Sequence, residues 1–226
     1  MRTKIFWLGM VCTLLKCTAS FGQTSSAEPV ETRSSLNLDS KLSLESSHGI
    51  WKSELGAGFL KGTRDAGFVL GAGPGMRVLA SHEAHDLGLA FFHYAWILSD
   101  VKGEGRWYRG NWEIRGEAFG GMEFRPRRAY VAGVAPILRY NFATGTRWMP
   151  FFDLGAGLSA TDIGRPDLST TFEFNLQTGA GVHYFWRENS ALTFQYRFFH
   201  LSNAGIERPN TGVNAGLFLA GLSWFF

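Results

Sequence analysis

The sequence predicts an all-β protein, an eight-stranded antiparallel up-and-down transmembrane β-barrel. Long segments alternate between apolar and polar residues, which is the side-chain period of a β-strand. The chain of 226 residues ends in the aromatic residue Phe226, and its tryptophans recur near the ends of the alternating segments. Together these features are typical of a barrel that crosses a membrane with tilted strands.

The alternation is clearest from residue 111 onward. In 111–124, "NWEIRGEAFGGMEF", the even positions carry apolar or small residues, whereas the odd positions include Glu113, Arg115 and Glu117. A soluble sandwich buries the apolar face of such a strand, and a membrane barrel turns that face to lipid, so alternation alone does not separate the two folds. The segments are at least as long as the roughly 9–11 residues that a tilted strand needs to cross a bilayer, which favours the barrel.

Nine segments have the pattern of a strand, although membrane barrels normally use an even number. Because "ELGAGF" and "VLGAGPG" resemble each other, we expect only one of 51–61 and 67–80 to be a full barrel strand, with 67–80 preferred. Eight strands then remain. The candidate segments are 51–61, 67–80, 87–99, 111–124, 128–142, 149–161, 170–186, 190–202 and 213–226.

Two sets of residues fit opposite faces of this barrel. If the strands run alternately up and down, five tryptophans fall at one rim and form an aromatic girdle. They are Trp96, Trp112, Trp148, Trp186 and Trp224. Side chains just fill the interior of an eight-stranded barrel, so we expect the charged residues of the polar faces to form a structural network and not a pore. They are Glu113, Arg115, Glu117, Arg139, Asp153, Glu173 and Arg197.

The start of the chain predicts a secretion signal. Arg2 and Lys4 precede an apolar run at 5–15 that is too short to span a bilayer, and small residues follow, so cleavage after Ala19 or Gly22 is expected. A secretion signal before a barrel with an aromatic end is typical of the bacterial outer membrane, where assembly machinery would recognise the C-terminal residue. The predicted organisation is a signal peptide at 1–22, a flexible lead-in rich in Ser at 23–48, and the barrel at 49–226, with the final Phe226 as the assembly signal.

Charge and cysteine content exclude other classes. Both cysteines, Cys12 and Cys17, lie in the signal, and Lys16 before Cys17 argues against a lipoprotein anchor, so the mature chain is expected to lack disulfides and thiol chemistry. Without Arg2, Lys4 and Lys16, the 22 basic residues fall to 19 and equal the 19 acidic ones. Charge therefore gives no support for a nucleic-acid partner. A homodimer is left open.

A polar pair interrupts the apolar stripe that precedes the last loop. His200 and Ser202 are two positions apart, so they share a face, and their parity puts them on the lipid-facing side. With both termini in the periplasm, the loop 203–212 lies outside the cell. A hairpin symmetric about Glu207 places Asn214 directly opposite His200, close enough for a hydrogen bond that offsets the cost of a polar group facing hydrocarbon.

The segment 196–214, "YRFFHLSNAGIERPNTGVN", resembles the C-terminal signature of the outer-membrane lipid A 3-O-deacylase family, and the resemblance extends over 86–226. The stretches "GNWEIRGEAF", "PILRYNF", "PFFDLGAGL" and "LQTGAGVHYF" resemble strands of that family. The resemblance implies a serine esterase without a cofactor, which removes the acyl chain esterified at the 3-position of lipid A from lipopolysaccharide in the outer leaflet. It also implies that His200 is the general base and Ser202 the nucleophile.

Other residues complete the expected catalytic site. The backbone N–H groups of Asn203, Ala204 and Gly205 are candidates for the oxyanion hole. Asn214 stands where the best-known form of the family has a Glu, and it can accept the imidazole N–H but offers no negative charge. Glu207 is the other acidic candidate for this third position, but its place at the loop tip favours a solvated side chain.

Three histidines and three arginines have weaker functional patterns. No carboxylate or Cys stands at a clear ligand spacing from the histidines, so we expect no metal site. These are His82, His85 and His93. The arginines lie in an outward loop and could meet the phosphates of the lipid, or could simply be solvated. These are Arg125, Arg127 and Arg128.

Two other functions stay open on the sequence. The missing Glu and the charged lumen are compatible with a non-enzymatic barrel that has a structural or lipid-binding role. An outer-membrane phospholipase would use the same His and Ser chemistry, but no cluster of calcium ligands is evident.

Overall fold

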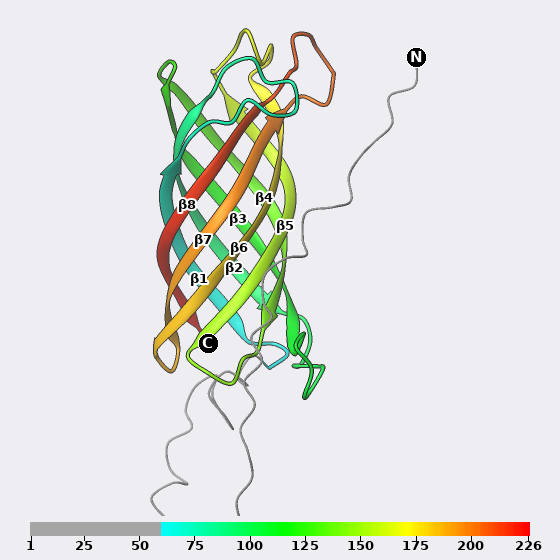
Figure 1. The fold of residues 1–226 in the computed structure, drawn as a ribbon, viewed down its shortest axis with the longest axis vertical. Helices are drawn as coiled ribbons and strands as arrows, with labels where there is room; N and C mark the ends of the chain where they lie inside the picture. Colours follow the sequence, from blue (N-terminus) through cyan, green and yellow to red (C-terminus); the bar gives the residue numbers. More distant parts are fainter. Residues whose placement is uncertain (1–59) are drawn as a thin grey trace, which may run out of the picture. The chain divides into compact units, whose positions relative to one another are not determined.

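The computed structural model describes residues 60–226, which form one closed antiparallel barrel of eight strands (Figure 1). Each strand pairs with its neighbours in sequence, and β1 closes the barrel against β8, which confirms the predicted fold. The strands are β1 (Arg64–Gly73), β2 (Asp86–Ile97), β3 (Gly110–Arg125), β4 (Ala129–Phe142), β5 (Trp148–Thr161), β6 (Phe172–Arg187), β7 (Ser190–Ser202) and β8 (Val213–Phe225). The predicted signal peptide and lead-in lie outside the described residues. Across residues 60–226, no helix is long and apolar enough to span a membrane.

The first strand differs most from its predicted bounds. The preferred segment 67–80 does contain barrel residues, but β1 begins at Arg64, which pairs with Trp96, and ends at Gly73. Pro74 follows and has no N–H for the ladder, so regular pairing stops there. The rival segment 51–61 lies outside the described residues except for its last two, which are not in a strand.

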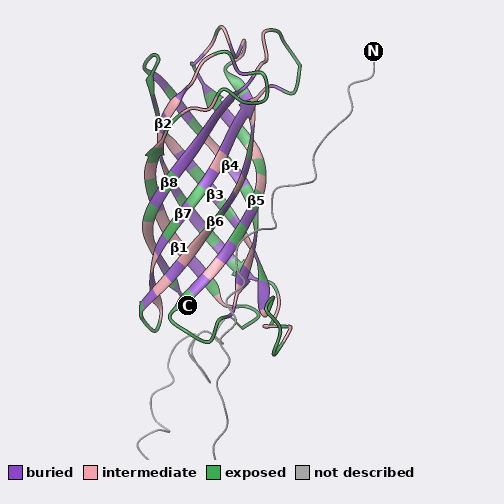
Figure 2. Cartoon of the chain, in the orientation of Figure 1, coloured by how far each residue is buried: buried purple, intermediate pink, exposed green. Residues whose placement is uncertain are grey.

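Side chains alternate between a buried inner face and a more exposed outer face along most of the barrel, except at the start of β8, where Val213–Leu217 are all buried (Figure 2). In β3, for example, Glu113, Arg115 and Glu117 are buried, whereas Trp112 and Ala118 are exposed. The tryptophans of the predicted girdle are all exposed and lie toward the rim where β8 ends, here called the terminal end. They are Trp96, Trp112, Trp148, Trp186 and Trp224. The barrel therefore presents its apolar face outward, as a bilayer requires.

A belt of buried ion pairs fills the middle of the barrel. The Arg139 guanidinium donates to both carboxylate oxygens of Asp153, at 2.6 and 2.8 Å, and lies over the Phe151 ring. Arg197 donates to Glu117 at 2.5 Å. These contacts account for most of the predicted polar network, and each buried charge in them has an oppositely charged partner. The first pair joins the neighbouring strands β4 and β5, and the second joins β7 to β3 across the lumen.

Apolar side chains close the lumen on both sides of this belt. One buried cluster includes Phe91, Phe119 and Phe199, and the other includes Phe185 and Phe225 at the terminal end. Of the predicted network, Glu173 differs. It is buried and accepts a hydrogen bond from Thr170 in the loop before β6, at 2.8 Å, so it belongs to the loop end of the barrel and not to the central belt.

Removing one partner from the central belt should destabilise the barrel. We expect Arg139→Met to lower the free energy of unfolding by roughly 3–5 kcal/mol, because Asp153 would keep a buried charge without its bidentate partner. Urea unfolding in detergent micelles, followed by tryptophan fluorescence, measures this. The exposed Arg106→Met is the matched control and should change stability by less than about 0.5 kcal/mol. Equal stability of both variants would contradict the structural role.

Candidate functional site

The site forms where β7 and β8 meet their connecting loop. His200 pairs directly with Asn214 across the two strands, which confirms the register predicted from the hairpin. The His200 Nδ1 lies 2.7 Å from the Asn214 Oδ1, and the His200 Nε2 lies 3.0 Å from the Ser202 Oγ. The three side chains therefore form one hydrogen-bonded chain from Asn214 to Ser202.

The orientation of the Asn214 amide follows from a fourth group. The Nδ2 of Asn214 donates to the backbone oxygen of Val78 at 2.9 Å. A carbonyl oxygen can only accept, so the amide nitrogen must face Val78 and the amide oxygen must face His200. Because that oxygen is also only an acceptor, His200 carries its proton on Nδ1. Its Nε2 is then free to accept the hydroxyl proton of Ser202, as a general base must.

The pair is more deeply covered than its parity predicts. His200 and Ser202 are on the outward face, but His200 is only 9% exposed, Asn214 is fully buried and Ser202 is half-buried. The loop 74–85 causes this, because it runs over the end of β8, where the Met76 N–H donates to the backbone oxygen of Asn214 at 2.8 Å. The expectation that the whole pair faces lipid is therefore wrong for His200, since protein and not hydrocarbon covers the ring.

Gly212 closes the site from the other side. It has a φ of +84°, and a Cβ there would lie 2.7 Å from the Cε1 of His200. Only a glycine satisfies both the backbone conformation and this close approach. No sequence motif pointed to a role for Gly212 or for Val78. A glycine directly before β8 is compatible with close packing of the backbone against a neighbouring side chain, whereas nothing in the local sequence pointed to Val78.

The loop after Ser202 is held by its own side chains. The Asn203 N–H donates to the Asn210 Oδ1 and the Gly205 N–H to the Asn203 Oδ1, at 2.9 and 3.0 Å. Two of the three predicted oxyanion-hole amides are thus already engaged. Within residues 60–226 no partner is found for the N–H of Ala204, whose φ is +56°. Glu207 is exposed and contributes its backbone oxygen to the loop, so it does not reach His200 as a third member.

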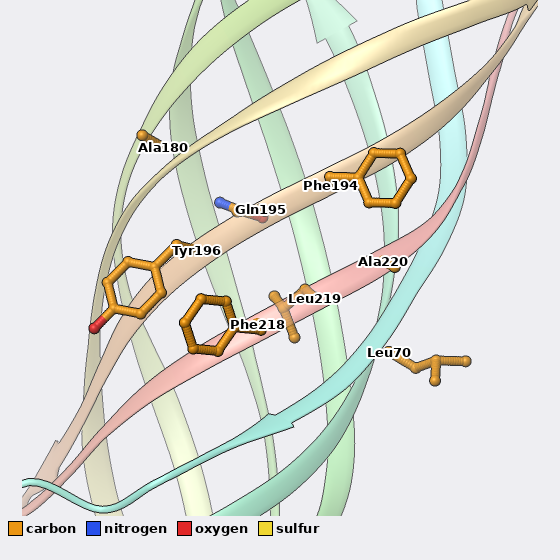
Figure 3. Close-up of a pocket in the computed structure, with 8 residues that line it drawn as sticks. All are labelled: Leu70, Ala180, Phe194, Gln195, Tyr196, Phe218, Leu219 and Ala220. Atoms are coloured by element: carbon orange, nitrogen blue, oxygen red, sulfur yellow. The ribbon is translucent and has the colours of Figure 1, made fainter.

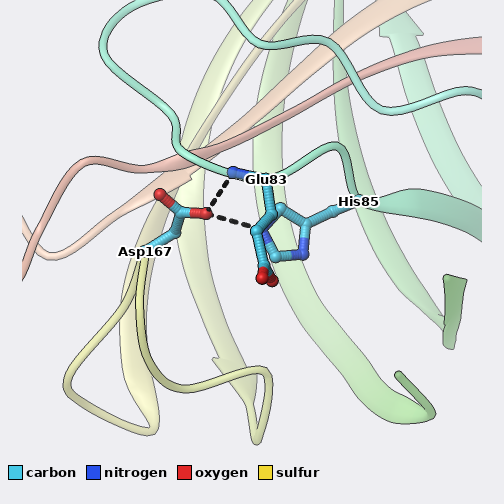
Figure 4. Close-up of side chains that lie close together, drawn as sticks. All are labelled: Glu83, His85 and Asp167. Atoms are coloured by element: carbon cyan, nitrogen blue, oxygen red, sulfur yellow. Dashed lines mark hydrogen bonds and ion pairs between the residues drawn. The ribbon is translucent and has the colours of Figure 1, made fainter. Parts of the chain in front are cut away.

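A second polar cluster joins three loops at the loop end of the barrel, the end opposite the C-terminus (Figure 1). Asp167, in the loop 162–171, is buried and accepts hydrogen bonds from the backbone N–H groups of His82 and Glu83 and from the hydroxyl of Thr211. Its Oδ2 also lies 3.0 Å from the Nε2 of His85 (Figure 4). We call Asp167, His85 and these donors the loop clamp.

The charges in the loop clamp stabilise one another. The two ring nitrogens of His85 lie 2.5 Å from Glu123 and 3.0 Å from Asp167, so both donate and the ring is an imidazolium. Burial alone disfavours this cation, but the hydrogen bonds to the two carboxylates raise the pKa of His85 above its ordinary value. Burial likewise opposes ionisation of Asp167, yet the hydrogen bonds from Thr211, His82 and His85 lower the pKa of Asp167 well below its usual range.

The same cluster contains the candidate metal ligands of the described chain. Glu83, His85 and Asp167 each offer one atom, and these atoms lie within 4.8 Å of one another. A carboxylate has about four acceptor positions, and four donors already occupy those of Asp167. The cluster is therefore an ion-paired hydrogen-bond network. The other two histidines, His82 and His93, lie in different places. His82 also contacts Asp167, whereas His93 bonds Asp65 inside the barrel.

The predicted phosphate contacts are exposed at the loop end. Arg127 donates to Glu83 at 3.2 Å and to the backbone oxygen of Arg165 at 2.6 Å, while Arg125 lies 3.8 Å from Asp86. Arg128 is exposed in the short connection between β3 and β4. The arginines therefore share the end of the barrel with Ser202, and two of them also bind carboxylates of the protein.

An apolar groove lies on the outer wall over β6, β7, β8 and β1 (Figure 3). It has a volume of about 410 Å³. Its outward lining residues are Leu70, Ala180, Phe194, Tyr196, Phe218 and Ala220. Tyr196 pairs with Phe218 four residues from the His200–Asn214 pair, about 13 Å toward the terminal end at roughly 3.3 Å per residue. The groove and the His–Ser pair thus occupy one face of the same hairpin.

Comparisons with known proteins agree with this architecture. A sequence model described as lipid A 3-O-deacylase (PagL) matches residues 94–223, more than half of the chain. The lipid A deacylase PagL of Pseudomonas aeruginosa is 32% identical over 84 residues, which cover 36% of this chain and 46% of that protein. The match therefore spans less than half the length of this curated relative.

Two solved structures have a similar fold at low sequence identity. The crystal structure of the outer membrane enzyme PagL has a TM-score of 0.49 and 20% identity, covering 70% of this chain and 97% of that one. The crystal structure of Neisserial surface protein A has a TM-score of 0.51 and 15% identity, covering 73% and 97%. At 15% identity, the likeness to Neisserial surface protein A concerns the fold of the barrel alone.

The orientation of Asn214 predicts the tautomer of His200. In protein labelled with ¹⁵N-histidine in micelles, we expect His200 to show a protonated Nδ1 and an unprotonated Nε2 at neutral pH. Asn214→Leu removes the acceptor and should shift the equilibrium away from this tautomer. The lumenal His183, whose Nδ1 contacts Thr193, serves as the internal reference. An unprotonated Nδ1 at His200 in the unmodified protein would refute the assignment.

Proposed function

Since the chain belongs to the lipid A 3-O-deacylase family, we propose that it is a serine esterase that hydrolyses the acyl ester at the 3-position of lipid A. The protein is a bacterial outer-membrane β-barrel. The observation that carries the proposal is the hydrogen-bonded chain from Asn214 through His200 to Ser202. All three residues lie inside the region that matches the family, 94–223.

The first half of the reaction forms an acyl-enzyme. The Ser202 Oγ attacks the ester carbonyl carbon while His200 Nε2 takes its proton. The sugar hydroxyl at the 3-position leaves with that proton, which the imidazolium returns. During both proton transfers, the Oδ1 of Asn214 holds the His200 ring by accepting its Nδ1–H. In the second half, water attacks the acyl-enzyme with the same proton transfers, which releases the fatty acid and restores the serine.

The neutral third residue has a cost in rate. An Asn amide orients the imidazole but cannot offer a negative charge to the imidazolium that forms in the transition state. The developing oxyanion also needs donors, and the N–H of Ala204 is the member of the predicted set that the loop leaves free. We therefore expect a working but slower esterase than a site with a carboxylate at position 214.

The position of the site suits a lipid substrate. A lipopolysaccharide molecule in the outer leaflet approaches the barrel from the side, and Ser202 is on the outer wall near the loop end. Its phosphates would then lie at the level of the exposed arginines, which form charge-assisted hydrogen bonds with phosphate. These are Arg125, Arg127 and Arg128.

The apolar groove provides a place for the acyl chain. It lies on the terminal-end side of the His–Ser pair, with Tyr196 and Phe218 four residues from the His200–Asn214 pair. This is the direction in which an acyl chain of the outer leaflet runs toward the middle of the bilayer. Phe194, Phe218 and Leu70 line it from three adjacent strands (Figure 3). Burying the chain there aligns the ester with Ser202 before attack. Recognition of Phe226 by assembly machinery and a homodimer stay predictions.

Loss of the nucleophile tests the proposed reaction. Purified protein mixed with lipopolysaccharide should release one acyl chain per lipid A, seen as a mass loss, and Ser202→Ala should slow this by at least about 10³-fold. Phospholipid vesicles provide the second substrate. Faster hydrolysis of phospholipid than of lipopolysaccharide would favour the phospholipase, and no hydrolysis of either lipid would favour a non-enzymatic barrel.

Filling the groove tests whether the acyl chain binds there. We expect Ala220→Phe to slow deacylation by about tenfold or more, because a displaced chain misaligns the ester. Ala118→Phe makes the same change at an exposed outward position on β3, away from the groove, and should leave the rate unchanged. Equal deacylation rates for the two variants, measured by mass spectrometry on the same lipid, would exclude this groove as the binding site of the acyl chain.

A further inference from the structure

The loop clamp joins elements that are far apart in sequence and all end at the site. Asp167 is buried in the loop 162–171, and its partners come from the loop 74–85 and from the end of the loop 203–212. Its backbone oxygen also accepts from the N–H groups of Thr211 and Gly212, at 3.0 and 3.3 Å. One residue of a loop without catalytic groups thus holds both loops that touch His200 and Asn214.

We propose that Asp167 is a positioning residue for the esterase, which sets the geometry of His200 and Asn214 by locking the loops 74–85 and 203–212 together. The inference rests on the proposed function, because the rate that it affects is that of Ser202. It is distinct from that function in assigning a role to a residue that touches neither the substrate nor the reacting atoms.

One arm of the clamp acts on Asn214. The backbone N–H groups of His82 and Glu83 donate to Asp167 at 2.6 and 2.9 Å, which fixes the far end of the loop 74–85. The near end presents the Val78 oxygen to the Asn214 amide at 2.9 Å. A carboxylate at position 214 would need no such acceptor, whereas an amide has two different ends and must be turned the right way.

The residues between these two points are in an unusual conformation. Leu79 and Ala80, directly after Val78, have φ values of +54° and +73°, which side chains bearing a Cβ rarely adopt. Such conformations persist only where surrounding contacts hold them. The Ser81 N–H donates to the Val78 oxygen at 3.2 Å, and the next two residues, His82 and Glu83, are the donors to Asp167, so this turn and the clamp together hold the Val78 oxygen in place.

The other arm acts on His200. The Thr211 hydroxyl donates to Asp167 at 2.5 Å, and the next residue, Gly212, lies against the Cε1 edge of the His200 ring. A ring held between Gly212 and Asn214 has little freedom to rotate away from Ser202. Catalysis is sensitive to this, because a displacement of about 1 Å can lower a rate by up to 10²-fold.

The clamp is itself anchored to the barrel wall. His85 lies between Asp167 and Glu123, a fully buried residue of β3. The imidazolium neutralises both carboxylates, and its raised pKa agrees with this bridging position. The loops are therefore linked through His85 to β3, a strand outside the β7–β8 hairpin. This link fixes the position of the loops relative to the barrel wall.

The test compares two carboxylates of the same loop. Asp167→Asn keeps the shape of the side chain but presents an amide N–H to the donors at one end, which breaks part of the clamp. Asp162→Asn is the matched control, because Asp162 is exposed and bonds only the N–H of Tyr130 among the described groups. Both variants are purified in micelles, and kcat and KM for lipopolysaccharide are measured together with the ¹⁵N signals of His200.

We expect Asp167→Asn to lower kcat by about 10- to 100-fold with little change in KM, and to disturb the Nδ1–H signal of His200. Asp162→Asn should match the unmodified protein in both readouts. If Asp167→Asn does not fold, Thr211→Val removes a single donor to Asp167 and should give a smaller change of the same kind.

Two failures can be told apart. If the unmodified protein hydrolyses the lipid and the clamp variants keep its kcat and its His200 signal, the positioning role is wrong and the proposed function stands. If the unmodified protein hydrolyses nothing, the proposed function fails, while the His200 signals still decide whether Asp167 positions the ring. An equal loss of kcat in Asp162→Asn would also overturn the inference, because any change in the loop would then suffice.

Discussion

The absence of water inside a bilayer is the constraint on which this structure depends. A strand in hydrocarbon must pair all of its backbone N–H and C=O groups, and only a closed ladder leaves no edge unpaired. The pairing of β1 with β8 completes that ladder. Closure then gives each strand one face toward lipid and one toward a narrow lumen, which determines where every side chain can go. The tryptophans of the girdle are on the outside, and the charged residues of the membrane-spanning strands are inside, where they pair with one another.

The same constraint explains why polar groups on the outer wall need special protection. His200, Ser202 and Asn214 are on the outward face by parity, yet His200 and Asn214 are almost completely buried. The loop 74–85 and Gly212 provide this cover, so that only Ser202 is partly open to the surroundings. Burial of His200 and Asn214 also strengthens the hydrogen bond between them, because a hydrogen bond is electrostatically stronger in a protein interior than in water.

An amide as the proposed third member of the catalytic site changes what the rest of the protein must supply. A carboxylate attracts the imidazolium from either oxygen, whereas an amide must be held with its oxygen toward the ring. The Val78 oxygen does this, and the loop that carries it is fastened at Asp167. In this view the ion pair of His85 with Asp167 and Glu123 stabilises loops instead of taking part in the reaction.

The sequence by itself determined the strands apart from the bounds of the first, their inward and outward faces, and the pairing of His200 with Asn214. These features follow from a period of two residues and from the length of one hairpin loop, both of which are local. Only the tertiary structure decided how the site is covered, which amides of the 203–212 loop are free, and that Val78, Gly212 and Asp167 belong to its surroundings. These contacts join residues such as His82 and Asp167, which are 85 positions apart, and they depend on how irregular loops pack. No periodic pattern encodes that packing, because each hydrogen bond in it requires the closed barrel to bring the loops to the same end.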